Sequence, residues 1–334
     1  MRALLSRHAG APETLTLEDI PTPKVGAGMV LVSVRACGVN YPDVLIINDL
    51  YQFRPERPFA PGSEFAGVIT QIGDGVTDLT IGHRVAGFVL WGAMAEELAV
   101  DAKRVFRIPA AMPFEEAAAC LVTYGTAYHA LKERAALSAG ETVLVLGAAG
   151  GVGVAAVDIC TALGAHVIAA ASSERKITVA KNRGAAHGIV YPLSPLDQAG
   201  QRQLARLFKQ AVGDNGANVI VDTVGGDYTE AALRCIGWGG RLLVIGFPSG
   251  IPRIPLNLVL LKGCQIVGVF FGGAFEHDPS RFRTTVETLF ELYTTGKIKP
   301  YISERYSLSQ GAQAISRLAS REATGKIVIT MEAL

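Results

Sequence analysis

The chain has 334 residues, about twice the usual length of a single domain, so two domains are expected. Its 31 basic and 30 acidic residues nearly cancel, and the net charge of +1 argues against a general nucleic-acid or anionic-membrane binder. The five cysteines form no CxxC pair, which argues against a disulfide framework or a zinc knuckle. Because no apolar run reaches the ~18 residues of a membrane span, we expect a soluble, cytoplasmic protein.

The first 110 residues contain short β-type runs separated by glycine and proline, which predicts an antiparallel, barrel-like domain. These runs are residues 29–39, 64–73, 84–89 and 104–109. The sequence pattern changes from β-type to helical at Pro113. Residues 113–134 open with this proline and two glutamates and continue with strong helix formers, so a helix is expected there.

From residue 141 onwards, apolar runs alternate with helical segments. The runs are residues 142–146, 166–171, 188–191, 218–224, 241–246 and 265–270. They are apolar nearly throughout, as is typical of parallel strands buried on both faces. The pattern predicts an α/β doubly wound parallel sheet. The tail then predicts helices over 281–293 and 309–320 and a last strand over 326–330.

A glycine-rich loop follows the first of these strands directly and leads into a helical pattern. Its glycines are Gly147, Gly150, Gly151 and Gly153, and the apolar helix face begins at Val152. Strand, glycine loop and helix thus occur in the order that aims a helix N-terminus at a pyrophosphate. The glycine pattern alone is weak, because a tight turn in a β–α unit could produce it. The six surrounding strands favour dinucleotide binding.

The end of the second parallel strand indicates which dinucleotide is bound. An NAD site usually has an acidic residue there, whereas this strand ends in small residues and is followed by Ser172 and Ser173. Glu174 is near, but Arg175 and Lys176 follow it. Hydroxyl groups and a cation suit the 2′-phosphate of NADP(H). The alternative is a serine-capped helix with ordinary charges in its first turn.

Several motifs together resemble the medium-chain dehydrogenase/reductases, and among them the zinc-free, zeta-crystallin-like quinone oxidoreductases. They are GVNYPDVL (38–45), PGSEFAGVI (61–69), VTYGTAYHAL (122–131), GAAGGVG (147–153), DTVGG (222–226) and ATGKIVI (323–329). The resemblance covers the whole chain. It implies a GroES-like β-barrel catalytic domain over 1–121 and 273–334, with a Rossmann NADP(H)-binding domain over 122–272 inserted in it.

The resemblance also bears on metal binding. The positions that hold catalytic zinc in the zinc-dependent members of this superfamily look like Asn40, Ser63 and Val122 here, and none is a ligand suited to zinc. Cys37 and Cys120 lie close in sequence but off the ligand positions. We therefore expect no metal.

The same resemblance places Asn40 and Tyr51 on the substrate side of the nicotinamide as catalytic residues. A phenol can donate a hydrogen bond or a proton to a carbonyl oxygen, and an amide can orient that oxygen. The alternatives make Asn40 a turn residue and Tyr51 a packed loop aromatic. Asp43 is expected to cap a short helix over residues 43–49.

Further cofactor contacts follow from the resemblance alone. Lys176, Tyr191 and Arg321 would bind the 2′-phosphate, although Tyr191 could simply end a strand and Arg321 could cap a helix. The nicotinamide side would be formed by Thr126, Val224, Phe270, Phe271 and Gly272. Of these, Val224 and the segment 270–273 could equally be core or turn residues. Lys326 matches the family's terminal Gly-Lys pair, and its role in the cofactor site is left open.

The sequence thus predicts an NADPH:quinone oxidoreductase, a zinc-independent reductase that passes hydride to a small quinone or α,β-unsaturated carbonyl compound. One alternative is an enoyl-thioester reductase, for which Arg54 and Arg57 could form a basic rim for coenzyme A, unless they are ordinary solvated charges. Another is a non-catalytic, crystallin-like NADPH-binding protein. The resemblance favours a homodimer with a contact around 265–270, and no nucleic-acid or membrane partner is expected.

Overall fold

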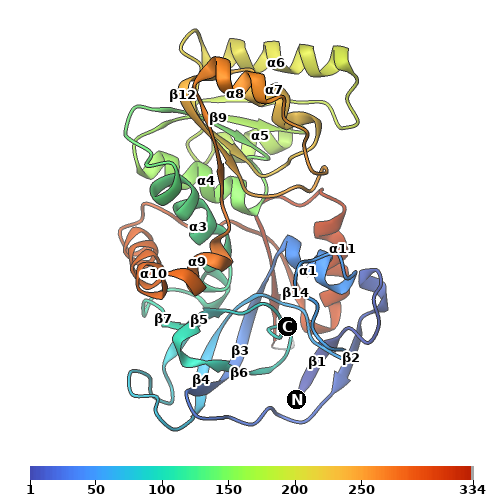
Figure 1. Cartoon of the computed structure of the whole chain (residues 1–334). Helices are drawn as coiled ribbons and strands as arrows, with labels where there is room; N and C mark the ends of the chain where they lie inside the picture. Colours follow the sequence, from blue (N-terminus) through green and yellow to red (C-terminus); the bar gives the residue numbers. More distant parts are fainter. Residues whose placement is uncertain (332–334) are drawn as a thin grey trace. The chain divides into compact units, whose positions relative to one another are not determined.

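The computed structural model describes residues 1–331, which fall into two compact units. The first unit takes both ends of the chain, Met1–Val122 and the residues from Pro300 onwards, and the second is Thr123–Lys299. In Figure 1 the second unit is the part of the chain coloured from green through yellow to orange. The expected domain assignment over 273–334 ends in three residues, 332–334, that lie outside the described part of the chain.

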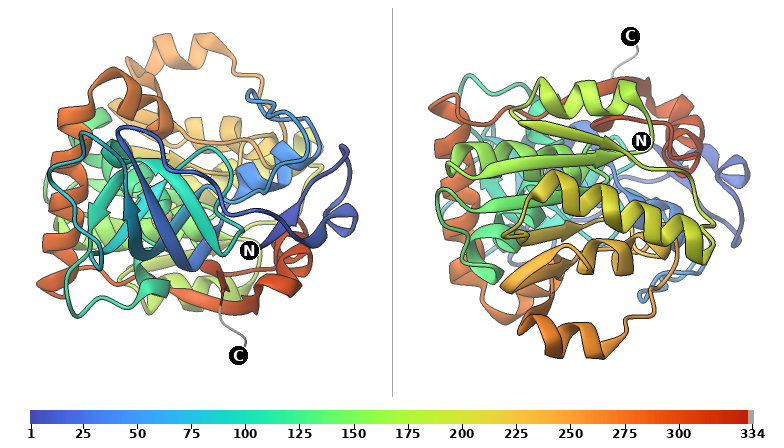
Figure 2. Two further views of the ribbon diagram at one scale, coloured as in Figure 1. Left: turned by 90° about the horizontal axis from the view of Figure 1, so that it is seen from below. Right: turned by 90° about the horizontal axis from the view of Figure 1, so that it is seen from above.

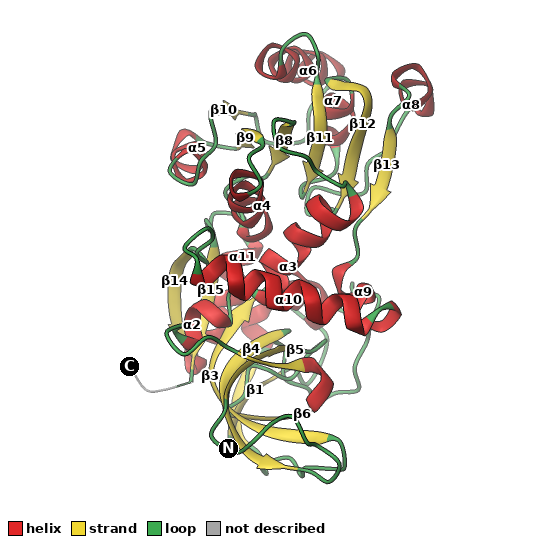
Figure 3. Cartoon of the chain, turned by 90° about the vertical axis from the view of Figure 1, so that its left-hand side faces the viewer, coloured by secondary structure: helices red, strands yellow, loops and turns green. Residues whose placement is uncertain are grey.

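The second unit is built on a six-stranded sheet in the order β10-β9-β8-β11-β12-β13, in which all neighbours are parallel (Figure 3). Its strands are β8 (Thr142–Leu146), β9 (His166–Ala171), β10 (His187–Val190), β11 (Ala217–Asp222), β12 (Ile236–Val244) and β13 (Gln265–Gly268). The order reverses beside β8, the strand that leads into the glycine loop. This confirms the predicted doubly wound sheet, and its ligand site is expected at that reversal.

Helices cover both faces of this sheet (Figure 2) because each connection between its parallel strands crosses over through a helix. These crossover helices are α4 (Gly151–Ala162), α5 (Glu174–Lys181), α6 (Gln198–Val212), α7 (Asp227–Leu233) and α8 (Leu256–Lys262). Three further helices are α3 (Leu121–Tyr128), which precedes β8, and α9 (Phe271–His277) and α10 (Pro279–Thr294), which follow β13. The strands are apolar because both faces are covered. Val143, Leu144, Val145 and Leu146 of β8, for example, are all fully buried.

The first unit contains a mixed sheet in the order β14-β15-β3-β4-β5-β7, with β6 also paired to β3. Its strands are β3 (Met29–Val39), β4 (Glu64–Ile72), β5 (Arg84–Phe88), β6 (Glu97–Asp101), β7 (Val105–Arg107), β14 (Ile302–Ser307) and β15 (Lys326–Thr330). A two-stranded sheet of β1 (Arg2–Leu5) and β2 (Thr16–Asp19) accompanies it, with helices α1 (Tyr41–Ile47), α2 (Phe114–Ala117) and α11 (Gly311–Ala319). The pairing of β15 with β3 brings residues 327–330 beside residues 36–39.

The boundary between the units on the C-terminal side differs from the expected one, because residues 273–299 group with the second unit. Packing of α10 explains the difference. Phe282 of α10 stacks on Phe271 with ring centroids 4.6 Å apart, and Thr285 donates a 2.5 Å hydrogen bond to Glu133. An aromatic pair and a half-buried polar contact therefore hold α10 within its own unit.

The expected helix over 113–134 is interrupted. It divides into α2, α3 and a π-helical segment, His129–Arg134. The break between α2 and α3 is residues 118–120, and directly after it, in the first turn of α3, Glu64 Oε2 accepts a 2.9 Å hydrogen bond from the backbone N–H of Val122. Close packing also constrains this region, because a Cβ on Gly38 of β3 would clash with the carbonyl oxygen of Ala118. Tertiary contacts with β3 and β4 thus override the local helical preference.

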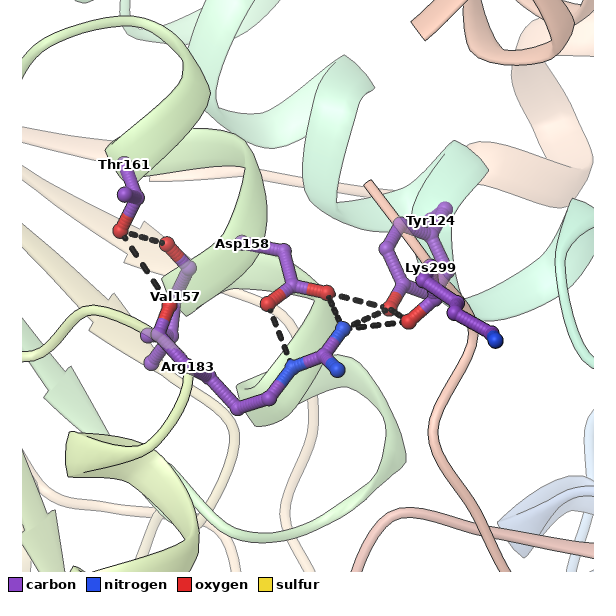
Figure 4. A network of polar contacts seen from close by, with 6 residues as sticks. All are labelled: Tyr124, Val157, Asp158, Thr161, Arg183 and Lys299. Atoms are coloured by element: carbon purple, nitrogen blue, oxygen red, sulfur yellow. Dashed lines mark hydrogen bonds and ion pairs between the residues drawn. The ribbon is translucent and has the colours of Figure 1, made fainter. Parts of the chain in front are cut away.

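A buried polar network lies within the second unit, close to where the chain leaves it (Figure 4). Asp158 of α4 pairs with Arg183 and accepts a 2.6 Å hydrogen bond from Tyr124 Oη. Tyr124 and Arg183 also donate to the carbonyl oxygen of Lys299. Burial raises the pKa of Asp158, and its hydrogen bonds to Arg183 and Tyr124 oppose that shift. The network ties both ends of the second unit, Tyr124 and Lys299, to α4.

Within residues 1–331, no helix combines the length and the apolar character that crossing a membrane requires.

Candidate functional site

The glycine loop adopts a conformation that only glycine fits at two of its positions. Gly147 has a φ of +69°, and a Cβ there would lie 2.5 Å from Thr223 Oγ1. A Cβ on Gly153 would clash with the carbonyl oxygen of Gly147. Between them, Gly150 donates to Gly147 O at 2.9 Å and starts α4 as its N-cap residue. The loop is therefore a tight turn, as the alternative interpretation holds, and it also delivers a helix N-terminus.

The first turn of α4 leaves its backbone donors available for a ligand. Gly151, Val152 and Gly153 form this turn, and the N-cap residue Gly150 has no side chain with which to cap it. Among the described residues, no side-chain hydrogen bond caps α4 at Gly150. Uncapped N–H groups at the positive end of a helix dipole attract phosphate.

The turn after β11 packs against this loop and is held by a buried carboxylate. Asp222 accepts hydrogen bonds from the backbone N–H groups of Val224 at 2.9 Å and Gly225 at 2.8 Å, and from Thr229 Oγ1 at 2.5 Å. Burial raises the pKa of Asp222, whereas these hydrogen bonds lower it. Thr223 Oγ1 donates to Leu146 O at 2.8 Å, at the end of β8. Val224 is thus fixed beside the glycine loop.

The residues expected at the 2′-phosphate lie together after β9. Lys176 Nζ donates a 3.1 Å hydrogen bond to Ser172 Oγ, and Ser173 Oγ accepts from the Lys176 backbone N–H at 3.4 Å. Ser173 therefore also caps α5, as the alternative interpretation proposed. Tyr191 N–H donates to Ala171 O at 2.9 Å, so the end of β10 adjoins the same place. The Tyr191 ring is buried 4.7 Å from the Tyr228 ring.

Arg321, expected at the same phosphate, belongs to the first unit. It follows α11 and has a φ of +59°, a left-handed conformation that is uncommon for a residue with a side chain.

The residues expected on the nicotinamide side differ in exposure. Phe270 is 52% exposed, whereas Phe271 is buried, with its ring against Gly125 of α3 and stacked on Phe282. Gly272 follows in α9, and Thr126 is buried in α3. The Phe271 ring therefore serves the packing of the second unit, and its backbone and the Phe270 side chain are what remain for a ligand.

In the first unit, Asn40 lies at the centre of a buried hydrogen-bond network. Its Oδ1 accepts from Lys326 Nζ at 2.5 Å, and its Nδ2 lies 2.9 Å from Glu64 Oε1, 3.1 Å from Ser63 Oγ and 3.2 Å from Gly38 O. Lys326 also forms an ion pair with Glu64, and both side chains are at most 5% exposed. Lys326, considered for the cofactor site, is thus engaged with Asn40 and Glu64.

Asp43 supports the backbone around Asn40. Its carboxylate accepts from the backbone N–H of Asn40 at 2.7 Å and from that of Gly62 at 3.0 Å. Asp43 thus caps the helix from within its first turn and not from the start of a helix over 43–49, because α1 is Tyr41–Ile47, its N-cap residue is Asn40, and Asp43 is the N3 residue of the capping box. Burial raises the pKa of Asp43 to about 6, against the effect of both hydrogen bonds.

Tyr51 is half-buried and packs against the apolar core of the first unit, with its ring 5.8 Å from that of Phe53. Burial raises the pKa of the Tyr51 phenol, and the negative charge of Asp43 raises it further. The phenol therefore remains protonated at neutral pH and can act as a donor.

The donors around Asn40 do not suit zinc. Asn40 and Ser63 supply an amide and a hydroxyl, Val122 supplies no side-chain ligand, and the ammonium of Lys326 adjoins them. Cys37 and Cys120 are buried thiols whose pKa values burial raises, the opposite of what metal binding requires. Over residues 1–331, no three His, Cys, Asp or Glu side chains are grouped so that they could hold a metal ion.

Sequence reasoning missed the parts played by Glu64 and Asp222. Both are carboxylates within or at the end of apolar strands, in EFAGVI and NVIVD. A charged residue in such a run is rarely buried unless it is paired, and this signal could have identified both residues.

Comparisons with known proteins agree with this arrangement. A family model described as a zinc-binding dehydrogenase matches residues 151–291, and one described as the alcohol dehydrogenase GroES-like domain matches residues 26–110. The latter match confirms the GroES-like fold expected for the first unit.

Individual relatives extend over almost the whole chain. A quinone oxidoreductase-like protein 2 homolog of Nematostella vectensis is 39% identical over 98% of this chain and 88% of its own length. The human quinone oxidoreductase is 30% identical over 99% and 98%. The crystal structure of the Escherichia coli quinone oxidoreductase complexed with NADPH superposes with a TM-score of 0.90 at 26% identity, covering 99% and 100% of the two chains. The chain belongs to the medium-chain dehydrogenase/reductase family, among the relatives of the quinone oxidoreductases.

Proposed function

We propose that this protein is an NADPH-dependent, zinc-independent reductase that passes hydride to a quinone or to an α,β-unsaturated carbonyl compound. The observation that carries the proposal is the hydrogen bond between Lys176 and Ser172. This pair follows β9, and the neighbouring strand β8 leads into the glycine loop and the uncapped N-terminus of α4. This combination suits a dinucleotide with a 2′-phosphate, and the E. coli relative was crystallised with NADPH.

In this proposal the first turn of α4, Gly151–Gly153, binds the pyrophosphate through backbone N–H groups. Ser172, Ser173 and Lys176 bind the 2′-phosphate, with Tyr191 and Arg321 as further partners. Val224, Thr126 and the segment 270–272 face the nicotinamide. When bound, the reduced nicotinamide supplies a hydride for the carbonyl compound.

Negative charge then develops on the substrate oxygen, and we assign its stabilisation to Tyr51 and Asn40. The raised pKa of Tyr51 favours its protonated, donating form. Asn40 is held in one orientation by Lys326 and Glu64, so it is preorganised for such a role. The unsuitability of Asn40, Ser63 and Val122 as zinc ligands supports a reaction that uses no zinc ion.

An enoyl-thioester reductase is the alternative substrate class. The basic rim considered for coenzyme A is weakened by the environment of Arg57. This side chain pairs with Asp49, donates to Ile47 O at 3.1 Å and lies over the Phe59 ring, which leaves exposed Arg54 as the remaining cation of the pair. A non-catalytic NADPH-binding protein is a further alternative. The ordered hydrogen-bond network around Asn40 argues against it.

The proposal is tested with the purified protein by following the absorbance of NADPH with a panel of quinones, enones and enoyl thioesters. Oxidation of NADPH by a quinone or an enone is expected. Turnover confined to enoyl thioesters would favour the alternative reductase. Tight binding of NADPH without acceleration by any acceptor would refute the reductase assignment.

We also propose a homodimer formed through the β13 edge of the second sheet. β13 is an edge strand, and around it Ile266, Trp238 and the α8 residues Leu256, Leu260 and Leu261 are exposed. An exposed apolar edge of this kind is normally covered by another chain.

We propose the cytoplasm as the location of the protein. All five cysteines are free thiols, which suits this reducing compartment.

A further inference from the structure

The orientation of the Asn40 amide is fixed by the chemistry of its neighbours. The Lys326 ammonium has only hydrogens to offer, so the Asn40 atom 2.5 Å from it must be the oxygen, Oδ1. Glu64 pairs with that ammonium as a carboxylate, so the Asn40 atom 2.9 Å from Glu64 Oε1 must be the nitrogen, Nδ2. Two independent contacts therefore give the same assignment.

This orientation determines the direction of the hydrogen bond to Ser63. Nδ2 of Asn40 can only donate, so Ser63 Oγ, at 3.1 Å, must accept. A serine hydroxyl has one hydrogen of its own, which it does not use in this contact. Among the described residues, 1–331, the Ser63 hydroxyl makes no other hydrogen bond. A buried hydroxyl group whose hydrogen has no acceptor in the protein has that hydrogen available for a water molecule or a ligand.

The backbone holds Ser63 in place. Gly62, the preceding residue, has a φ of +100°, and a Cβ on it would lie 2.7 Å from Met94 N and 2.9 Å from Cys37 Sγ. One carboxylate, Asp43, accepts from both Gly62 N–H and Asn40 N–H, and so fixes the two segments that carry Ser63 and Asn40. Such rigidity is what an oxyanion-binding donor requires.

Ser63 is the most exposed of the four residues whose side chains form this network, at 8%, against 6% for Asn40, 4% for Lys326 and 0% for Glu64. Asp43 accepts a hydrogen bond from Gly62, the residue before Ser63, and its negative charge raises the pKa of the Tyr51 phenol. One carboxylate therefore acts both on the backbone that carries Ser63 and on the Tyr51 hydroxyl group.

We propose that Ser63 is a catalytic residue whose hydroxyl donates a hydrogen bond to the oxygen of the bound quinone or enone. This inference rests on the proposed reductase function. Lys326 and Asn40 are then positioning residues, because the ammonium polarises the amide, and the amide in turn makes the Ser63 hydroxyl a stronger donor. Asn40, to which the proposed function assigns stabilisation of the substrate oxygen, thus acts indirectly, through Ser63, because its Nδ2 group is already directed at Gly38 O, Ser63 Oγ and Glu64 Oε1.

The step keeps its atoms and electrons in balance. The hydride carries two electrons to the electron-poor carbon of the substrate, and the displaced π-electron pair ends on the oxygen. Ser63 hydrogen-bonds this oxyanion and keeps its own proton, and the proton that completes the product comes from Tyr51 or water. The Ser63 hydroxyl thus stabilises the negative charge that a Lewis acid would otherwise stabilise.

The test compares wild-type protein with Ser63→Ala and Ser63→Thr, using the quinone or enone that the wild type reduces best. Loss of one oxyanion donor is expected to lower kcat by ~10²-fold or more in Ser63→Ala, with little change in KM. Ser63→Thr keeps a hydroxyl and is expected to retain most of the activity. Ser303→Ala is the matched control, because its hydroxyl contacts the backbone oxygen of Lys326 at 3.3 Å and not its ammonium.

A second measurement does not depend on turnover. The carbonyl stretching band of an enone bound together with NADP⁺ is recorded by infrared difference spectroscopy. A donor on the oxygen lowers the frequency of this band, so it is expected at lower wavenumber in the wild type and Ser303→Ala than in Ser63→Ala.

The outcomes separate the two proposals. A wild type that binds NADPH and reduces no acceptor overturns the proposed function, and the Ser63 assignment with it. An active wild type, with kcat and band position unchanged in a folded Ser63→Ala protein, overturns the Ser63 assignment alone. A loss in Ser63→Thr as large as that in Ser63→Ala, with the same band in all variants, also overturns it.

Discussion

Lys326 on β15 donates a hydrogen bond to Asn40 at 2.5 Å and forms a buried ion pair with Glu64 on β4. These residues come from opposite ends of the chain, and β3, which lies between β15 and β4 in the sheet, joins them. The pair is the most deeply buried charge contact of the first unit and links its fold to its candidate site.

Removing the Lys326 ammonium is expected to lower the free energy of unfolding by about 3–5 kcal/mol, because Glu64 is left as an uncompensated buried charge. The variant is Lys326→Met, measured by urea denaturation. Lys103→Met, at an exposed lysine, is the control. Adding Glu64→Gln to Lys326→Met is expected to restore part of the loss. If Lys326→Met were as stable as Lys103→Met, the ion pair of Lys326 with Glu64 would not stabilise the fold.

Asp43 predicts a specific pH dependence of stability. Its pKa in the folded protein is raised to about 6, above the ~3.9 of an unfolded chain, so the folded state binds this proton more tightly. The stabilising effect of this proton is complete below pH ~4 and is lost as the pH rises to about 6.

Asp43→Asn removes this titration. The free energy of unfolding of the wild type, minus that of Asp43→Asn, is therefore expected to fall between pH ~4 and ~6 and to stay constant above. The charges that act on Asp43, Glu64 and Lys326, are present in both proteins. A difference that rises over this range would show that the folded-state pKa is lowered instead.

Cofactor selectivity tests the Lys176 group. In Lys176→Glu, the carboxylate is expected to weaken NADPH binding by ~10- to 100-fold and to affect NADH much less, because only NADPH carries the 2′-phosphate. Dissociation constants for both cofactors are measured by fluorescence titration. Lys181→Glu makes the same charge change at an exposed position of the same helix and serves as the control. Equal losses for NADPH and NADH would refute this phosphate site.

The network around Asp158 is expected to stabilise the second unit. Arg183→Met leaves Asp158 buried and unpaired, which should lower the free energy of unfolding by about 3–5 kcal/mol. Tyr124→Phe removes one hydroxyl and should lower it by only about 1–3 kcal/mol. Chemical denaturation measures both. If Tyr124→Phe were as damaging as Arg183→Met, the ion pair would not be the main element of the network.

The proposed dimer is tested by size-exclusion chromatography with light scattering. Leu260→Asp, at a residue of α8 that is 79% exposed, is expected to shift the protein from dimer to monomer. Leu193→Asp is the matched control, because Leu193 is 75% exposed and follows β10 at the opposite edge of the sheet. A wild-type monomer, or a dimer that survives Leu260→Asp, would contradict this interface.

The second unit could be predicted well from the sequence because its signals are local. The parallel strands appear as apolar runs, and the glycines of 147–153 follow the first of them directly. The first unit was harder to predict because its site depends on distant pairings. Glu64 binds the backbone N–H of Val122 at the start of α3, in a segment that local preference predicts as one continuous helix, and local sequence gives no sign of this contact.

The candidate site shows the same division. The Ser172–Lys176 group lies within one short segment, and its proximity follows from the start of a helix. The neighbourhood of Asn40 depends on β15 pairing with β3, which the motif around Lys326 does not reveal. Resemblance could name Lys326 as important, but the ammonium's contact with Asn40 required the structure.

The pairing of β15 with β3 has a consequence for synthesis in the cell. Asn40 and Glu64 leave the ribosome well before Lys326, and the whole second unit is made between them. The second unit is continuous in sequence and can fold while translation proceeds. The first unit instead keeps an unneutralised carboxylate on β4 until β15 is released, so a chain that stops before β15 would contain a complete second unit and an incomplete first unit.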